Sequence, residues 1–284
     1  MFKVIGNIIK WIGEHFKGML FLLIVAILLM PSGDNQNPAN LQEIKLSGVI
    51  MNSDIIIQQI EEAQNNKNIK GVLLNVNSGG GSVPPSIEIS YAIKELKKHK
   101  PVVAYASGIM ASGSYYASIY ATKIIANAGS IIGSIGVIMQ SANIEKLLDT
   151  IGVKPQIVKQ GLYKEAGTPT REWTTEERAE LEQLTLDTYN LFVSDVASAR
   201  GLDINNSNTF ANAHIFSSKR ALEVGLIDEI GVKRDAKREL QKLAKVIKPM
   251  WKKKDRIDSI IEKFEGKVIA HIKSSFYGLK SELF

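Results

Sequence analysis

The chain has 284 residues, 45% of them hydrophobic, which is enough for one sizeable domain with additions and excludes disorder on the scale of the whole chain. Its formal net charge is +6, but the lysines are scattered and the basic excess lies near the two ends, which favours a membrane surface over nucleic acid as a partner. Cysteine is absent, which excludes disulfide bonds, thiolate metal sites and a cysteine nucleophile.

The N-terminal segment carries an export signal. An apolar run from Gly18 to Met30 follows Lys3, Lys10 and Lys17, and it ends without a small-x-small cleavage site. The run is short for a bilayer, but apolar residues before it can extend it. We therefore predict a retained, single-pass transmembrane anchor over 1–31 and a linker over 32–42. Because the positive charge precedes the run, the body is expected on the extracytoplasmic (periplasmic) side of the inner membrane.

From Ile44, short apolar runs alternate with amphipathic ones. This alternation predicts strands over 44–50, 72–76, 102–105 and 123–126, and helices over 53–64, 84–98 and about 112–120. The order is typical of an α/β fold with a mostly parallel sheet. In such a sheet, ligands bind beyond the carboxyl ends of the strands.

The second half of the body has a less regular pattern. The sequence predicts a turn entering a strand over 129–139, a helix over 142–150, a strand over 156–159 and a polar loop over 160–171. Thr174 and Glu177 have the spacing of a capping box, which opens a long helix that ends near Arg200. Its apolar stripe is expected to pack on the sheet or on a neighbouring subunit.

Two segments rich in small residues follow predicted strands. In the first, Ser112 lies where a strand gives way to a helix, so its hydroxyl is either a helix cap or a nucleophile near free N–H groups. In the second, Asn77 to Val83, glycines allow backbone N–H groups to approach a phosphate or an oxyanion. The absence of a Gly-Lys-Ser/Thr ending argues against a phosphate-binding P-loop.

A serine nucleophile needs a general base. Of the histidines, His15, His99 and His271 lie at the membrane segment, on a lysine-rich helix and in the tail, so His214 is the open candidate. A lysine is the alternative, provided that burial leaves its amine neutral. The spacing of the lysines does not choose among them.

Several of these segments together resemble the signal peptide peptidase A family, serine peptidases of Clp and crotonase-like fold with repeated ββα units. The resemblance rests on residues 77–83, 111–116, 133–137, 159–164 and 221–231. It implies a peptidase domain over 43–232 in which Ser112 is the nucleophile, Lys164 the general base and Ser134 the residue that orients the lysine. It also implies an oxyanion hole formed by backbone N–H groups of Gly113, Gly80 and Gly81. The chain departs from the family at Gly79, where proline is usual, and at Ser114, where glycine is usual; we expect Ser114 to tighten the wall beside the nucleophile.

The resemblance implies a membrane-anchored serine endopeptidase that cleaves apolar peptide segments such as remnant signal peptides, assembles into a homo-oligomeric ring and needs no cofactor or metal. Residues 233–284 are predicted to be a basic, amphipathic extension that lies on the membrane surface or on a neighbouring subunit. Two alternatives remain: a crotonase-type acyl-CoA enzyme, which an exported anchor disfavours, and a catalytically silent scaffold, which the presence of both Ser112 and Lys164 disfavours.

Overall fold

The structure is a computed structural model that describes Trp11 and residues 13–22 and 38–252, and the chain divides into the units Met1–Pro38 and Ala39–Phe284. In the first unit, residues 13–22 are helical. Within the described ranges, no helix has both the length and the apolar character needed to cross a bilayer. Residues 23–30 of the predicted anchor lie outside those ranges, so the anchor stays a prediction.

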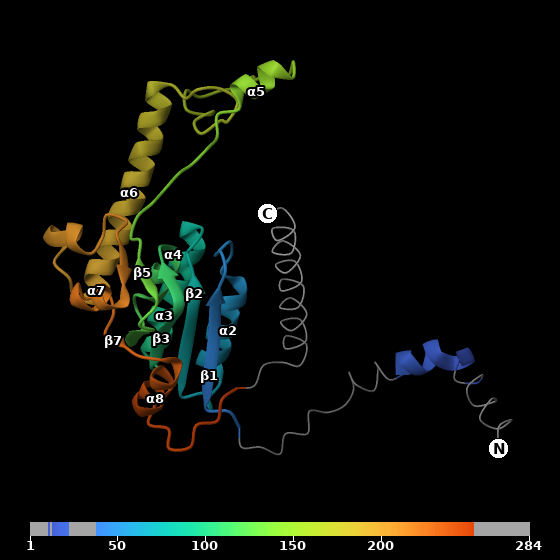
Figure 1. The fold of residues 1–284 in the computed structure, drawn as a ribbon, viewed down its shortest axis with the longest axis vertical. Helices are drawn as coiled ribbons and strands as arrows, with labels where there is room; N and C mark the ends of the chain where they lie inside the picture. Colours follow the sequence, from blue (N-terminus) through green and yellow to red (C-terminus); the bar gives the residue numbers. More distant parts are fainter. Residues whose placement is uncertain (1–10, 12, 23–37, 253–284) are drawn as a thin grey trace, which may run out of the picture. The chain divides into compact units, whose positions relative to one another are not determined.

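The second unit is built on a mixed sheet of seven strands (Figure 1). Five of them run parallel in the order β1 (Leu41–Ser47), β2 (Gly71–Ser78), β3 (Val102–Ala111), β4 (Lys123–Ala126) and β7 (Glu229–Ile230). Strand β5 (Ile131–Gly133) pairs with the end of β3, and β6 (Ile215–Ser217) pairs antiparallel with β5. The predicted α/β class with a mostly parallel sheet is confirmed.

Helices cover both faces of this sheet. The remaining elements are α2 (Asp54–Asn65), α3 (Val83–Lys97), α4 (Gly113–Ser118), α5 (Glu145–Thr150), α6 (Thr175–Arg200), a 3-10 helix (Ile204–Thr209), α7 (Ser218–Glu223) and α8 (Lys233–Leu243). One core joins α2, α3, α4 and the C-terminal half of α6 to one face, and a smaller core joins α8 to the other. Neighbouring strand residues therefore serve opposite cores: Leu74 faces the first core and Leu73 the second, as the alternation of side chains along a strand requires.

Several predicted elements differ from the structure. Strand β1 covers Leu41–Ser47 and not 44–50, so the last two residues of the predicted linker belong to the strand. Strand β3 continues to Ala111, because its last residues shift register past β2 and gain β5 as a partner. The predicted strand over 156–159 is wrong: no neighbouring strand lies within the described residues to pair with it, and its backbone has no regular structure. The helix predicted from 142 begins at Glu145, where the side chain of Asn143 accepts a hydrogen bond from the Glu145 N–H.

The predicted C-terminal extension begins inside the packed unit. Ala236 and Leu240 of α8 are fully buried against Leu73 and Val103, and Trp251 forms an isolated bridge with Leu41. The packing therefore continues past residue 232 to about residue 252. The rest of the predicted extension, 253–284, lies outside the described residues.

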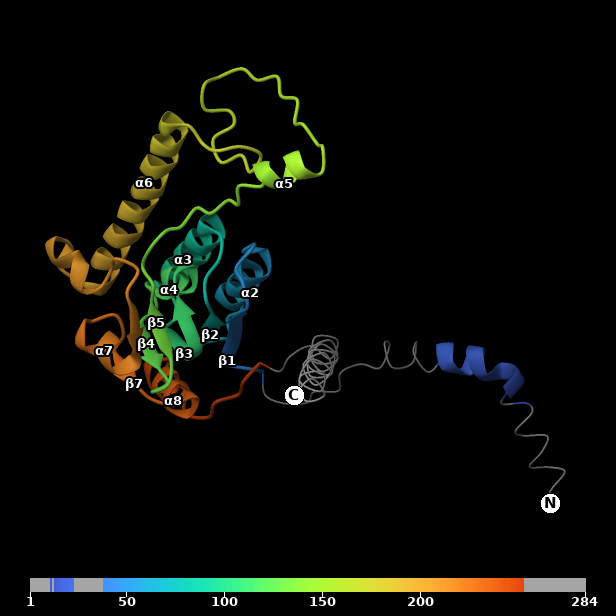
Figure 2. The same ribbon diagram turned by 45° about the horizontal axis from the view of Figure 1, so that its top comes forward.

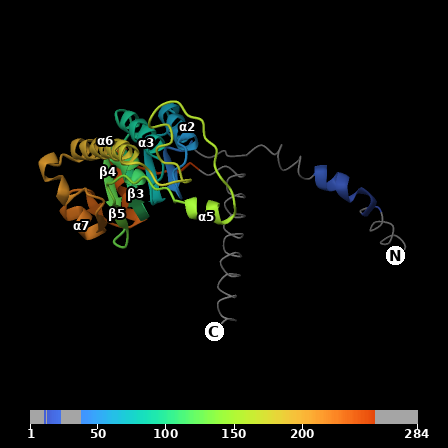
Figure 3. The same ribbon diagram turned by 90° about the horizontal axis from the view of Figure 1, so that it is seen from above.

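Residues 137–174 leave the sheet and return to it through α6, and we call this segment the arm. Figures 1 and 2 show the arm beyond the N-terminal end of α6, away from the sheet, and Figure 3 shows the same arm from above. The capping box predicted for Thr174 and Glu177 is present at the start of α6. The arm leaves several large apolar side chains exposed to solvent: Ile138, Met139, Leu147, Ile151, Val153, Ile157, Val158 and Leu162.

Candidate active site

Ser112 stands at the junction between β3 and α4 in a strained backbone conformation, with φ of +53° and ψ of −129°. Its N–H donates to the carbonyl of Gly133 at 2.8 Å, and its carbonyl accepts from the N–H of Tyr116 at 3.0 Å. A non-glycine residue in this region costs about 1–3 kcal/mol and persists only where its surroundings fix it, which is frequent at active sites. The junction thus presents a half-buried hydroxyl beyond the carboxyl end of a central strand.

Ser114 has a structural role behind this junction. Its hydroxyl donates to the carbonyl of Ser78 at 2.6 Å and accepts from the N–H of Ala111 at 2.9 Å. The side chain is fully buried, and it ties the end of β3 to the end of β2. The expectation that Ser114 tightens the wall beside the nucleophile is therefore wrong, because it faces the interior and does not line the pocket at Ser112.

The glycine turn after β2 lies directly against Ser112. Gly80 has φ of +96°, and a Cβ there would lie 2.6 Å from the nitrogen of Gly113 and 2.8 Å from Cβ of Ser112. A Cβ on Gly81 would lie 2.1 Å from the carbonyl oxygen of Ile50. Only glycine permits this approach at either position.

The N–H groups of the turn are not equivalent. The Gly80 N–H donates to the hydroxyl of Ser78 at 3.1 Å, so it is already used. The bridge between Gly81 and Ile50 uses the Gly80 carbonyl and the Ser82 N–H, which leaves the Gly81 N–H without an acceptor in the described part of the chain. The Gly113 N–H, at the first position of α4, likewise has none there. These two groups are the available donors for an anion at Ser112.

Strand register brings Ser134 next to this site. Gly133 pairs with Ala111, so the residues that follow them, Ser134 and Ser112, leave neighbouring parallel strands together. Ser134 also has a positive φ, +49°, and its N–H donates to the carbonyl of His214 at 2.7 Å. His214 contributes this carbonyl, while its ring lies edge-on to Phe216 and outside the pocket at Ser112.

A small pocket opens beside Ser112 with a largely apolar wall. Its apolar lining comes from α3, from the start of the arm and from α6, namely Val83, Ile87, Val137, Leu191 and Phe192. Tyr116 is the one ionisable side chain among the lining residues; its hydroxyl donates to Asp195, and its burial raises its pKa well above the ordinary value. Among the described residues, the pocket lining therefore includes no histidine, lysine or carboxylate that could act as a base.

Lys164 lies in the arm and is exposed. The turns that carry it, residues 161–167, lie at the end of α6 that is remote from the sheet (Figures 1 and 2). Within one chain, the fold brings Ser112, Ser134, Gly81 and Gly113 together but does not bring Lys164 to them.

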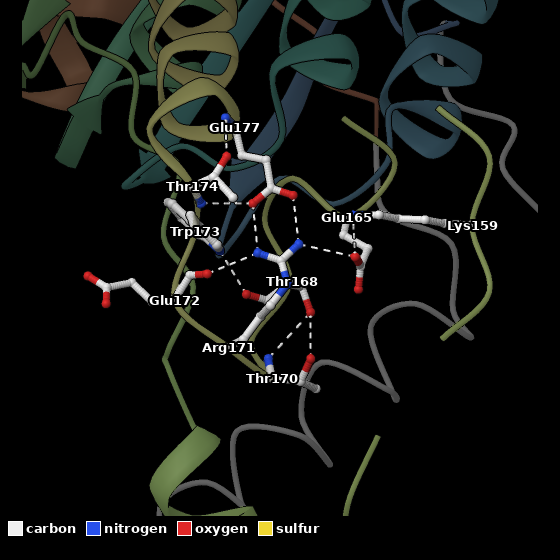
Figure 4. Close-up of polar contacts among 9 residues, drawn as sticks. All are labelled: Lys159, Glu165, Thr168, Thr170, Arg171, Glu172, Trp173, Thr174 and Glu177. Atoms are coloured by element: carbon white, nitrogen blue, oxygen red, sulfur yellow. Dashed lines mark hydrogen bonds and ion pairs between the residues drawn. The ribbon is translucent and has the colours of Figure 1, made fainter. Parts of the chain in front are cut away.

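An ionic cluster fixes the segment that contains Lys164 (Figure 4). Arg171 donates to both carboxylate oxygens of Glu177, at 2.8 and 2.7 Å, and to Glu165 at 3.1 Å, while Lys159 pairs with Glu165 from the other side. The Trp173 indole N–H donates to the carbonyl of Thr168 at 2.7 Å. The sequence predicts only a polar loop over 160–171, and the density of opposite charges is the signal that indicates the cluster.

The cluster makes the arm sensitive to acid. The hydrogen bonds from Arg171 and from the Thr174 N–H lower the pKa of Glu177 from 4.5 to about 2. Because the pKa of Glu177 is lower in the folded arm than in the unfolded chain, its ionised carboxylate stabilises the folded arm at any pH above about 4.5. This stabilisation is lost as the pH falls from about 4.5 towards 2.

We expect the fluorescence of Trp173, isolated by Trp11→Phe and Trp251→Phe, to be constant above about pH 4.5 and to change as the pH falls towards 2, where Glu177 takes up its proton. In an Arg171→Ala variant the change should begin at higher pH, because the carboxylate has lost its main partner. Arg178→Ala, which removes a nearby cation that contacts the Trp173 ring, is the control. Identical pH curves for Arg171→Ala and the parent would contradict this role.

Comparison with known proteins finds one matching family and several similar proteins that are named as proteases. Residues 94–247 match the family described as peptidase family S49. A protein of Methanocaldococcus jannaschii, provisionally named a protease, is 40% identical over 193 residues, which make up 68% of this chain and 62% of that protein. A protein of Enterococcus faecium, provisionally named signal peptide peptidase SppA, is 35% identical over 69% of this chain and 57% of its own length. Protease 4 of Salmonella typhi is 31% identical over 68% of this chain and 31% of its own length.

The chain thus spans less than two thirds of the length of these relatives. Among solved structures, a mutant of ClpP1 from Listeria monocytogenes matches 68% of this chain and 93% of its own, with a TM-score of 0.47 and 17% identity. A mutant of the 1510-N membrane-bound stomatin-specific protease matches 72% of this chain and 86% of its own, with a TM-score of 0.48 and 13% identity.

Proposed function

The chain belongs to peptidase family S49, and from that premise we propose that it is a serine endopeptidase with Ser112 as its nucleophile. The observation that carries the proposal is the junction at Ser112: a strained serine beyond the end of β3, adjacent to two N–H groups that have no acceptor within the described ranges. Such donors stabilise the negative charge that develops on a carbonyl oxygen under attack, and each contributes about 10²–10³-fold in rate.

In the proposed mechanism, a neutral Lys164 amine takes the proton of Ser112 while Oγ attacks the peptide carbonyl. The Gly81 and Gly113 N–H groups bind the resulting oxyanion. Lys164 then returns the proton to the leaving amine, and water, activated by the same amine, hydrolyses the acyl-enzyme. In this mechanism Ser134, which leaves its strand beside Ser112, accepts a hydrogen bond from the lysine and orients it.

We propose that Lys164 comes from a neighbouring copy of the chain. Three observations support this: the pocket at Ser112 contains no base of its own, Lys164 is exposed at the remote end of α6, and the arm that carries it exposes apolar side chains. A monomer would leave these side chains in water, whereas an assembly would cover them. A ring of identical subunits, in which the arm of each subunit packs on its neighbour, would account for all three observations.

The substrates are proposed to be extended, apolar peptides such as remnant signal peptides. The largely apolar pocket next to Ser112 would accept a small or apolar side chain at the cleavage point and would desolvate a charged one at high cost. With the anchor predicted over 1–31, the enzyme would act at the inner membrane, with this domain on its extracytoplasmic side.

We expect a fluorophosphonate probe to attach covalently to Ser112, as located by mass spectrometry of the labelled peptide. Among fluorogenic peptides, those with alanine or leucine at the cleavage point should be hydrolysed faster than those with lysine or aspartate, by about tenfold or more, because a charge in the pocket would be unpaired. A preference for charged residues would contradict the substrate class. Failure of the probe to label Ser112 would instead favour the acyl-CoA enzyme or the silent scaffold.

A further inference from the structure

One short segment carries a net charge equal to that of the whole protein. Residues 233–252 contain eight lysines and arginines and two acidic residues, a net charge of +6. This equals the net charge of the whole chain, so the other residues balance at 27 basic and 27 acidic. Residues 233–252, with α8 at their start, are therefore a concentrated basic segment.

Part of this charge is neutralised locally and part is not. Lys233 pairs with Glu43, Arg238 with Asp235 and Lys252 with Glu62. In contrast, Lys242, Lys245 and Lys248 have no carboxylate within ion-pair distance in the described part of the chain. Arg238, Gln241, Lys242, Lys245, Val246 and Ile247 line an open groove there, which we call the basic groove. Ile247 is 90% exposed and lies between Lys245 and Lys248 in the sequence.

The basic groove lies at the end of the sheet that is formed by the N-termini of the parallel strands. Leu240 and Ala244 pack against Gly71, the first residue of β2, leaving no room for a Cβ there. Asn40, immediately before β1, donates its backbone N–H to the carbonyl of Met250 at 2.8 Å and its side-chain amide to the carbonyl of Lys248 at 2.9 Å. Ser112 follows the last residue of β3 and therefore lies at the opposite end; Figures 1 and 2 show α8 and the segment after it near the start of β1, away from the arm.

The same end of the sheet receives the chain from the predicted anchor. Asn40 lies ten residues after Met30, the end of the apolar run. Ten extended residues span at most roughly 35 Å. If the apolar run is anchored in the bilayer, Asn40 therefore lies no more than about 35 Å from it, and the segment around Lys248 and Met250 is bound to Asn40.

We propose that the basic groove docks on the surface of the membrane, with Lys242, Lys245 and Lys248 binding the phosphates of anionic lipids and Ile247 entering the boundary between headgroups and acyl chains. This rests on the anchor in the proposed function. Unpaired lysines close to a bilayer are attracted to anionic headgroups, and an exposed apolar side chain among them adds burial at the interface. Docking orients the domain so that the Ser112 pocket faces away from the lipid.

The absence of cysteine allows the groove to be labelled at one position. The full chain with Ile247→Cys, carrying an environment-sensitive fluorophore, is reconstituted into nanodiscs that contain spin-labelled lipid with or without 30% phosphatidylglycerol in phosphatidylcholine. Gln183→Cys on exposed α6 is the matched label control. Lys242→Glu/Lys245→Glu/Lys248→Glu reverses the charge of the groove, and Lys67→Glu/Lys98→Glu/Lys219→Glu makes the same change of charge at exposed lysines outside the groove and the arm.

We expect the probe at 247 to be quenched several-fold more in the anionic discs than in the neutral ones, and the probe at 183 to be quenched in neither. The groove variant should lose the excess quenching, the control variant should keep it, and both should hydrolyse a soluble peptide as the parent does. Flotation of the discs reports insertion separately: a chain that does not float contradicts the anchor, and the proposal with it. A chain that floats but gives equal quenching in both lipids, or keeps it in the groove variant, contradicts the groove alone.

Discussion

Replacing Ser112 by alanine is expected to lower peptide hydrolysis by about 10⁴-fold or more, and replacing Lys164 by alanine by a similar factor, because neither nucleophile nor base works without the other. Alanine at 112 loses only the hydroxyl, so the thermal unfolding temperature should change little. Turnover of a fluorogenic peptide, followed for each purified variant, measures the effect.

The two inactive variants become informative when they are combined. Co-expressed at equal amounts, Ser112→Ala chains supply Lys164 and Lys164→Ala chains supply Ser112, so roughly a quarter of randomly formed head-to-tail contacts carry an intact pair. Activity should therefore recover to about a quarter of the parent value. If the co-expressed variants stay inactive, each chain completes its own dyad, and the proposed sharing between neighbours is wrong. The double variant Ser112→Ala/Lys164→Ala, co-expressed with the parent, controls for expression and assembly.

Replacing Gly80 by alanine should lower kcat by about a hundredfold or more, with a smaller change in KM. Its Cβ would lie 2.6 Å from the nitrogen of Gly113, and φ of +96° is unfavourable for alanine. The turn must then move away from Ser112, which displaces the Gly81 N–H from its position beside the Gly113 N–H. Steady-state kinetics on a peptide substrate checks this result.

Gly79 provides the matched control one residue earlier. A Cβ at Gly79 meets nothing within 4 Å, and its φ is not in the left-handed region, so Gly79→Ala should retain activity within a few-fold. If Gly79→Ala and Gly80→Ala lose activity equally, the loss comes from stiffening the turn in general rather than from the close approach at Gly80, and the assignment of the donors fails.

Much of this molecule follows from local pattern. The strands over Val72–Val76 and Lys123–Ala126, the helix between Pro84 and Lys98 and the capping box at Thr174 were all predictable, because apolar periodicity and capping depend on residues close in sequence. The prominence of Ser112 and of the glycine turn before it was predictable for the same reason. The strand over 156–159 failed because a strand needs a partner that the pattern of its own residues does not reveal.

The sequence by itself determined the α/β class, the family resemblance and two features of the site: a serine at a strand end and a turn that only glycine can form. It left the base open between His214 and a lysine, and Lys164 stays a prediction from the resemblance. The tertiary structure decided which donors are available, since the hydroxyl of Ser78 occupies the Gly80 N–H and leaves Gly81 and Gly113. It also decided that the segment with Lys164 lies far from Ser112 in the same chain, and that Lys242, Lys245 and Lys248 have no carboxylate within ion-pair distance among the described residues. These outcomes depend on strand register and on contacts between residues far apart in sequence, and no spacing along the chain encodes them.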